Sequence, residues 1–199
     1  QGQLVNIEAH ANTIANNLNN IASVVGSGIG TSCLTVIGQA VGTGDADCVK
    51  YYIKKMFIIS FIANAITVAI IMGTSQWLIY LWQQPAEAYP IALKCLYFCL
   101  SFQFVTYPLS FTTPAILKAT SDVKYVMWSA ISSMIIMRVG LCFLFTSDAL
   151  SPWLMSTFGF KFEFGAMGYW IGMCADWCVR SILFVARLLT GRWKKASGM

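Results

Sequence analysis

Charged residues are scarce in this chain. Only 11% of its 199 residues are Asp, Glu, Lys or Arg, whereas 57% are hydrophobic. A soluble domain carries about 25% charged residues. So few charged residues cannot supply the polar surface of a globular protein in water, which indicates that lipid surrounds most of this chain. The net charge of +5 does not point to nucleic acid, because the basic residues flank apolar runs instead of forming one patch.

Residues that carry enzyme chemistry are also few. The chain has one histidine, His10, and seven cysteines without a Cys-x-x-Cys pair. Metal-ligand spacing and a nucleophile-elbow motif are absent from the sequence. We therefore expect no enzyme, no bound metal and no cofactor. Six of the cysteines fall inside apolar runs, which is typical of small buried residues in a reducing compartment and not of a disulfide framework.

The sequence has about five apolar runs long enough to cross a bilayer, but no charged-then-apolar signal segment. A spanning run must satisfy its own backbone hydrogen bonds, so each is expected to be a helix. Pro108 and Pro114 should bend or break the third run. The runs cover 8–41, 56–81, 91–117, 125–145 and 165–189, followed by a tail at 190–199. The sequence predicts an all-α membrane protein, and its start at Gln1 leads us to expect a longer parent protein.

The basic residues are unevenly distributed among the connecting segments. Those after the first and third runs, together with the end of the fifth run and the tail, hold nearly all of them, namely Lys50, Lys54, Lys55, Lys118, Lys124, Arg187, Arg192, Lys194 and Lys195. The two alternate segments hold a single one, Lys161. This asymmetry predicts a multi-pass protein of the cell membrane with the basic loops and the C-terminus in the cytoplasm.

A polar stripe follows the first run. Its members are three or four residues apart, which places them on one helical face: Asn12, Asn16, Asn20, Ser23 and Ser27. Asn19 lies beside this stripe and Asn17 lies off it. Two interpretations stay open. The stripe makes hydrogen bonds between helices, or it lines a water-filled cavity for polar or cationic cargo.

Ionisable residues inside the runs are rare. Arg138 lies in the fourth run, and Asp176 and Arg180 lie four residues apart in the fifth. Counting about 1.5 Å per residue from one boundary puts Arg138 and Asp176 at similar depth. A charge in lipid finds a partner, so we expect a structural ion pair of Asp176 with Arg180 or Arg138. A coupling-ion or proton site at Asp176 is the functional alternative.

Three motifs in this order resemble one transporter family. Residues 9–47 resemble the second helix of a lobe in multidrug and toxic compound extrusion (MATE) transporters, which ends in a Gly-Gln-x-x-Gly-x-Gly-Asp turn; Gly38, Gln39, Gly42, Gly44 and Asp45 match that turn. Residues 116–125 resemble the family's Leu-Arg-Gly-x-Gly-Asp-x-Lys loop, with Ala119 and Ser121 in place of the two glycines. Residues 165–195 resemble its last helix and its Arg-x-x-x-Gly-Lys-Trp tail.

The resemblance implies a fold and an activity. MATE proteins have twelve helices in two six-helix lobes, and this chain would be the C-terminal lobe without its first helix. The family exports cationic drugs and other organic compounds in exchange for sodium ions or protons, by alternating access. The implied partners are small organic substrates, membrane lipid and an N-terminal lobe of the same protein, with no nucleic acid.

The resemblance leaves the coupling ion open. Many members place their coupling carboxylate in the N-terminal lobe, and others use acids in the seventh and tenth helices. The run at 91–117, which corresponds to the tenth, contains no Asp or Glu. A lipid-linked oligosaccharide flippase of the same superfamily is the second hypothesis. A non-transporting, truncated membrane fragment is the third.

Overall fold

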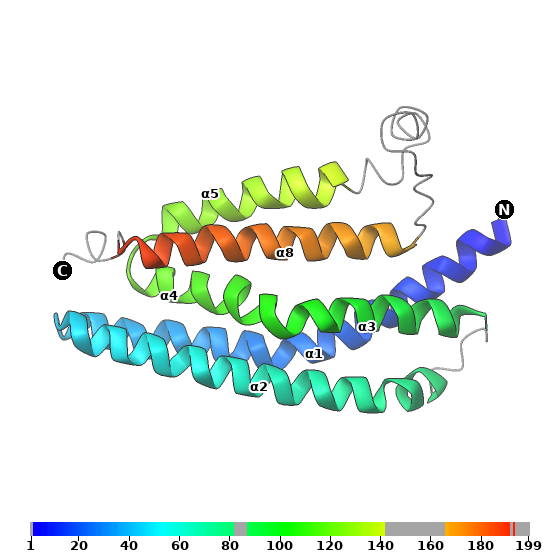
Figure 1. The fold of residues 1–199 in the computed structure, drawn as a ribbon, viewed down its shortest axis with the longest axis horizontal. Coiled ribbons are helices and arrows are strands. Elements are labelled where there is room, and N and C mark those ends of the chain that lie inside the picture. Colours follow the sequence, from blue (N-terminus) through cyan, green and yellow to red (C-terminus); the bar gives the residue numbers. More distant parts are fainter. Residues whose placement is uncertain (1, 82–86, 142–165, 192, 194–199) are drawn as a thin grey trace.

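The computed structural model describes residues 2–81, 87–141, 166–191 and 193. Within these ranges every regular element is a helix, and the helices lie side by side along one long axis (Figure 1). Three helical segments are long and apolar enough to cross a membrane, Ala9–Gly42, Ala46–Leu81 and Ala88–Ala119. The prediction of an all-α membrane protein is confirmed.

Two long antiparallel helices begin the bundle. Helix α1 spans Gly2–Gly42 and helix α2 spans Ala46–Leu81. The turn between them uses Gly44, whose φ of +73° suits a residue without a side chain. The Asp45 carboxylate then accepts the Asp47 amide at 2.9 Å, which caps the start of α2. The lysines at 50, 54 and 55, expected in a loop, instead lie in the first turns of α2, because a helix can continue past the apolar run.

The third predicted run forms one continuous helix, in which a π-helical turn separates two α-helical parts. It consists of α3 (Ala88–Tyr107), a π-helix η1 (Pro108–Thr112) and α4 (Thr113–Ala119). Pro108 has no N–H, so the Phe104 carbonyl loses its helical partner. The buried Asn64 of α2 donates to the carbonyls of Gln103 at 3.0 Å and Phe104 at 3.2 Å. Pro108 therefore widens the helix without ending it.

The last helices complete the bundle. Helix α5 (Val123–Ser133) continues as the π-helix η2 (Met134–Val139), and α8 spans Ala166–Leu189. Residues 142–145 and 165 of the predicted fourth and fifth runs lie outside the described residues. Figure 1 shows α8 between α5 and the α3–α4 helix, with α1 and α2 on the other side of that helix.

Two apolar clusters form the core. One joins α1, α2, α3 and α8 through residues such as Leu18, Leu96 and Trp170. The other lies at the end where the α1–α2 turn, the α4–α5 turn and the end of α8 gather (Figure 1), and it includes Ile37 and Phe184. The outward sides of α2, α5 and α8 expose large apolar side chains. Such surfaces suit lipid as the surrounding solvent.

Candidate functional site

The N-terminal part of the polar stripe is used inside the bundle. The Asn12 side-chain oxygen accepts the indole N–H of Trp170 on α8 at 3.0 Å. It also accepts the Asn16 amide at 3.3 Å. Both asparagines are half-buried. This part of the stripe joins helices, as in the first of the two interpretations.

The middle of the stripe also contacts α3. The Ser23 hydroxyl donates to the Asn19 carbonyl at 2.8 Å and accepts the Gln103 amide at 3.5 Å. Asn19, which the helical spacing places beside the stripe, is the buried asparagine of α1, and its side chain accepts the Cys99 thiol at 3.6 Å. The inward face of α1 is thus rotated slightly from the face that the spacing predicts.

The remaining stripe members face outward. Asn20 and Ser27 are exposed, together with Asn17, Thr31 and Thr35. The hydroxyls bond to carbonyls of their own helix, for example Ser27 to Val24 at 2.8 Å, which lets lipid tolerate them. The amides of Asn17 and Asn20 form no hydrogen bond within the described part of the chain. A free amide in hydrocarbon is costly, so this side of α1 requires water or a further polar partner.

Both carboxylate oxygens of the buried Asp176 on α8 accept hydrogen bonds. Asp176 has no exposed side-chain surface, and Arg180 donates through Nη2 to its two oxygens at 3.2 and 2.9 Å. The Ser133 hydroxyl donates to Oδ1 at 2.5 Å. Arg138 lies in η2 and makes no ion pair with Asp176. The spacing of four residues predicted Arg180 as a partner of Asp176. Ser133 could not be predicted as a second partner, because the sequence contains many hydroxyl side chains.

A cleft lies beside this pair. It has a volume of about 410 Å³ and is lined by residues of α1, η1, α4, α5 and α8. Ser27 of the stripe lies at its edge, and Arg180 and Lys118 supply its charged groups. The sequence contains no signal for this cleft, because its lining combines α1, α8 and the η1–α4–α5 segment, which are far apart along the chain.

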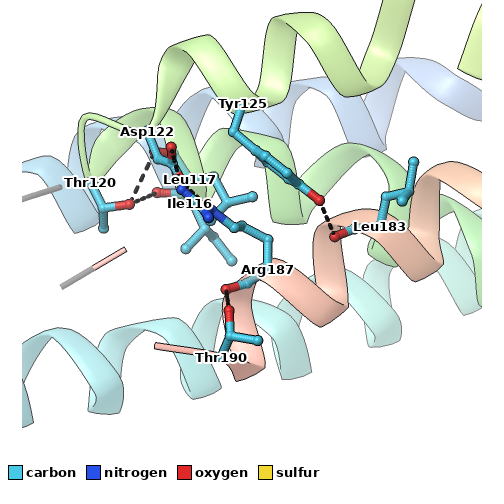
Figure 2. Close-up of polar contacts among 8 residues, drawn as sticks. All are labelled: Ile116, Leu117, Thr120, Asp122, Tyr125, Leu183, Arg187 and Thr190. Atoms are coloured by element: carbon cyan, nitrogen blue, oxygen red, sulfur yellow. Dashed lines mark hydrogen bonds and ion pairs between the residues drawn. The ribbon is translucent and has the colours of Figure 1, made fainter. Parts of the chain in front are cut away.

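A polar clasp closes one end of the bundle (Figure 2). Asp122, which follows α4, accepts Arg187 of α8 through Nε at 2.7 Å and Nη2 at 3.2 Å. The guanidinium stacks on the Tyr125 ring at 4.6 Å, and the Tyr125 hydroxyl donates to the Leu183 carbonyl at 3.0 Å. These contacts tie the α4–α5 turn to the end of α8.

The second core cluster, next to the clasp, brings residues of the three sequence motifs together. Gly191 adopts a φ of +65°, and Trp193 beyond it is buried in the second core cluster. That cluster also contains Ala40 from the glycine-rich turn and Leu117 from the α4–α5 segment. Opposite charges at Asp122 and Arg187, in segments predicted on the same side of the membrane, were the available signal for this contact.

These features define a helical membrane protein whose connecting turns lock together at one end. The family model described as MatE matches residues 9–144. The chain therefore belongs to the MATE family of transporters. No solved structure matches the chain.

Proposed function

We propose that this chain is part of a cation-coupled antiporter, which exports organic compounds, with cationic ones expected, in exchange for sodium ions or protons. The observation that supports this most is the outward side of α1, where the amides of Asn17 and Asn20 have no hydrogen-bond partner among the described residues and lie on a segment apolar enough to span the bilayer. An amide offers both a donor and an acceptor. It suits the wall of a water-filled cavity that receives varied polar cargo.

Alternating access then assigns a role to the rest of the bundle. Two repeats must move against each other around a shared site. The Ser133–Asp176 hydrogen bond and the Asp122–Arg187 clasp fasten α8 to its neighbours, which helps the bundle to move as one body. We propose an N-terminal lobe of the same protein as the moving partner, in the cell membrane, with the clasp and the C-terminus in the cytoplasm.

Substitution on the outward side of α1 tests this function. In the parent protein in vesicles, Asn20→Leu should lower ethidium export by about tenfold while the amount of folded protein stays unchanged, because one binding amide worth about 1.4 kcal/mol is lost. Val24→Leu, on an exposed position of the same helix, is the control and should export normally. Equal losses of export and of folded protein would favour a packing role for Asn20.

The same vesicles separate the alternatives. Export driven by an imposed sodium gradient or by a pH gradient identifies the coupling ion. Movement of a lipid-linked oligosaccharide without ethidium export would instead support a flippase.

The 199 residues alone are not expected to transport. Their free α1 amides would meet lipid or another copy of the chain, and unpaired polar groups in hydrocarbon seek partners. The purified chain should therefore self-associate in detergent and export no dye from liposomes. Ion-driven export by the chain alone would contradict the need for a second lobe.

A further inference from the structure

The cleft beside Arg180 has the size and lining of an organic ligand site. Its volume of about 410 Å³ falls within the range of about 300–1,000 Å³ that is typical of small-molecule pockets. Leu34 of α1 and Phe111 of η1 supply accessible apolar walls, with the buried Phe184 behind them. A ligand here would keep an apolar body against these side chains.

The charge of this cleft is positive. Lys118 and Arg180 line it, and no Asp or Glu belongs to its described lining. Asp176 lies one turn before Arg180 on α8 and neutralises only that arginine. Lys118 makes no ion pair within the part of the chain that the structure describes. A net positive charge in a partly enclosed apolar cleft attracts an anion.

Two buried polar atoms of the lining are unpartnered. The Ser110 hydroxyl is 1% exposed in terms of its residue and has no hydrogen-bond partner, and the Arg180 Nε is likewise buried without one, within the described residues. Buried polar groups are nearly always hydrogen-bonded. Both atoms are covered by neighbouring protein atoms, so the charge preference of the cleft comes from Lys118 and from the accessible part of Arg180.

We propose that this cleft binds an organic anion, with a carboxylate, sulfonate or phosphate head that reaches Lys118 and Arg180 and an apolar body that packs on Leu34 and Phe111. This site goes beyond the proposed export of cations, because its lining selects the opposite charge. A soluble organic acid and an anionic lipid share the required chemistry.

A matched pair of probes tests the charge preference. Dansylglycine carries a carboxylate, and its uncharged amide has the same apolar body. With the parent protein in phosphatidylcholine nanodiscs, and empty nanodiscs subtracted, fluorescence polarisation should show dansylglycine binding about tenfold more tightly than the amide, since tenfold corresponds to about 1.4 kcal/mol for one charge contact. Equal binding of the two probes would overturn the proposal.

Substitutions locate the binding. Lys118→Gln should weaken dansylglycine by about tenfold and leave the amide unchanged, because a hydrogen bond to a charged group is worth about 1.5–3 kcal/mol. Lys124→Gln is the control, since Lys124 is also exposed but does not line the cleft. Ser110→Ala is a second control and should leave dansylglycine binding unchanged, because the Ser110 hydroxyl is covered by the protein and does not reach the ligand. Equal weakening by the two lysine variants would mean a diffuse surface charge and refute the site.

The source of the anion is settled by lipid composition. If the natural ligand is a lipid, adding phosphatidylglycerol to the nanodiscs should weaken dansylglycine in the wild type more than in Lys118→Gln. If it is a soluble acid, the two should respond alike while the Lys118→Gln effect persists. Binding does not require transport, so dye export without dansylglycine binding refutes only this site. Dansylglycine binding without export by the parent protein refutes only the antiporter.

Discussion

Helix α8 carries two arginine–aspartate pairs that differ in how far apart their partners lie along the chain. In the middle of the helix, Arg180 pairs with Asp176 one turn away, with side chains 16% and 0% exposed. At its end, Arg187 pairs with Asp122, 65 residues earlier in the chain, with side chains 21% and 9% exposed. The first pair neutralises a charge inside the bundle, whereas the second connects two segments that meet only in the fold.

The difference teaches what each pair stabilises. Asp176 and Arg180 are four residues apart on one helix, so they meet wherever α8 forms. Their pair therefore contributes little to the packing of α8 against other helices. Its Ser133 contact is the part that links α8 to α5. The Asp122–Arg187 pair forms only when the α4–α5 turn and the end of α8 are correctly placed. It therefore contributes to the arrangement of the bundle.

The largest effect is expected at the middle pair. Asp176→Asn removes the charge that compensates the buried Arg180, and breaking a buried pair in this way costs about 3–5 kcal/mol. Folded yield and thermal stability in detergent should both fall. The double variant Asp176→Asn with Arg180→Gln, in which no charge is left uncompensated, should recover much of the loss. A well-folded Asp176→Asn protein that binds dye but loses ion coupling would show instead that Asp176 is a coupling site.

A smaller effect is expected at the clasp. Arg187→Gln removes two charged hydrogen bonds to Asp122 and the stacking on Tyr125, but the group stays partly accessible to water, so we expect a loss of about 1–3 kcal/mol. Arg187→Lys keeps the positive charge but lacks the planar guanidinium, so its stability should lie between those of the wild type and Arg187→Gln. Limited proteolysis should show easier cleavage near the α4–α5 turn. If Arg187→Gln destabilised the protein more than Asp176→Asn, the proposed order of the two pairs would be wrong.

The sequence predicted those features that depend on local spacing and composition. Apolar runs identified the helices, and their charges identified which segments leave the apolar region. The stripe on α1 followed from helical period, but its division into an inward part at Asn12 and an outward part at Asn20 depends on where α3 and α8 pack. Contacts between elements, such as that of Asp122 with Arg187, cannot be derived from period at all.

The missed polar contacts have a common physical origin. Asn64 is an amide in the middle of an apolar run, which is an available signal for a functional or structural role. Its partners, however, are backbone carbonyls on a different helix, those of Gln103 and of Phe104, and Pro108 removes the helical partner of Phe104. A carbonyl left unpaired by a proline in one helix and an amide in another helix can be recognised as partners only when the two helices are known to be neighbours. The cleft beside Arg180 needed five elements in place.

The smallest effect is expected at the turn next to the clasp, where Ser121 has a φ of +66°. The resemblance to the MATE loop places a glycine at this position, and glycine adopts this left-handed region freely, whereas other residues pay about 1–2 kcal/mol. Ser121→Gly also makes the unfolded chain more flexible, which offsets part of the gain. We expect a net stabilisation below about 1 kcal/mol, visible as a small rise in thermal midpoint in detergent.

Ser121→Val is the matched control and should destabilise the protein, because a β-branched side chain suits a positive φ poorly. A lower midpoint for Ser121→Gly would mean that the serine side chain contributes more to the folded turn than its backbone strain costs. The clasp would then depend on this residue as well as on Asp122 and Arg187.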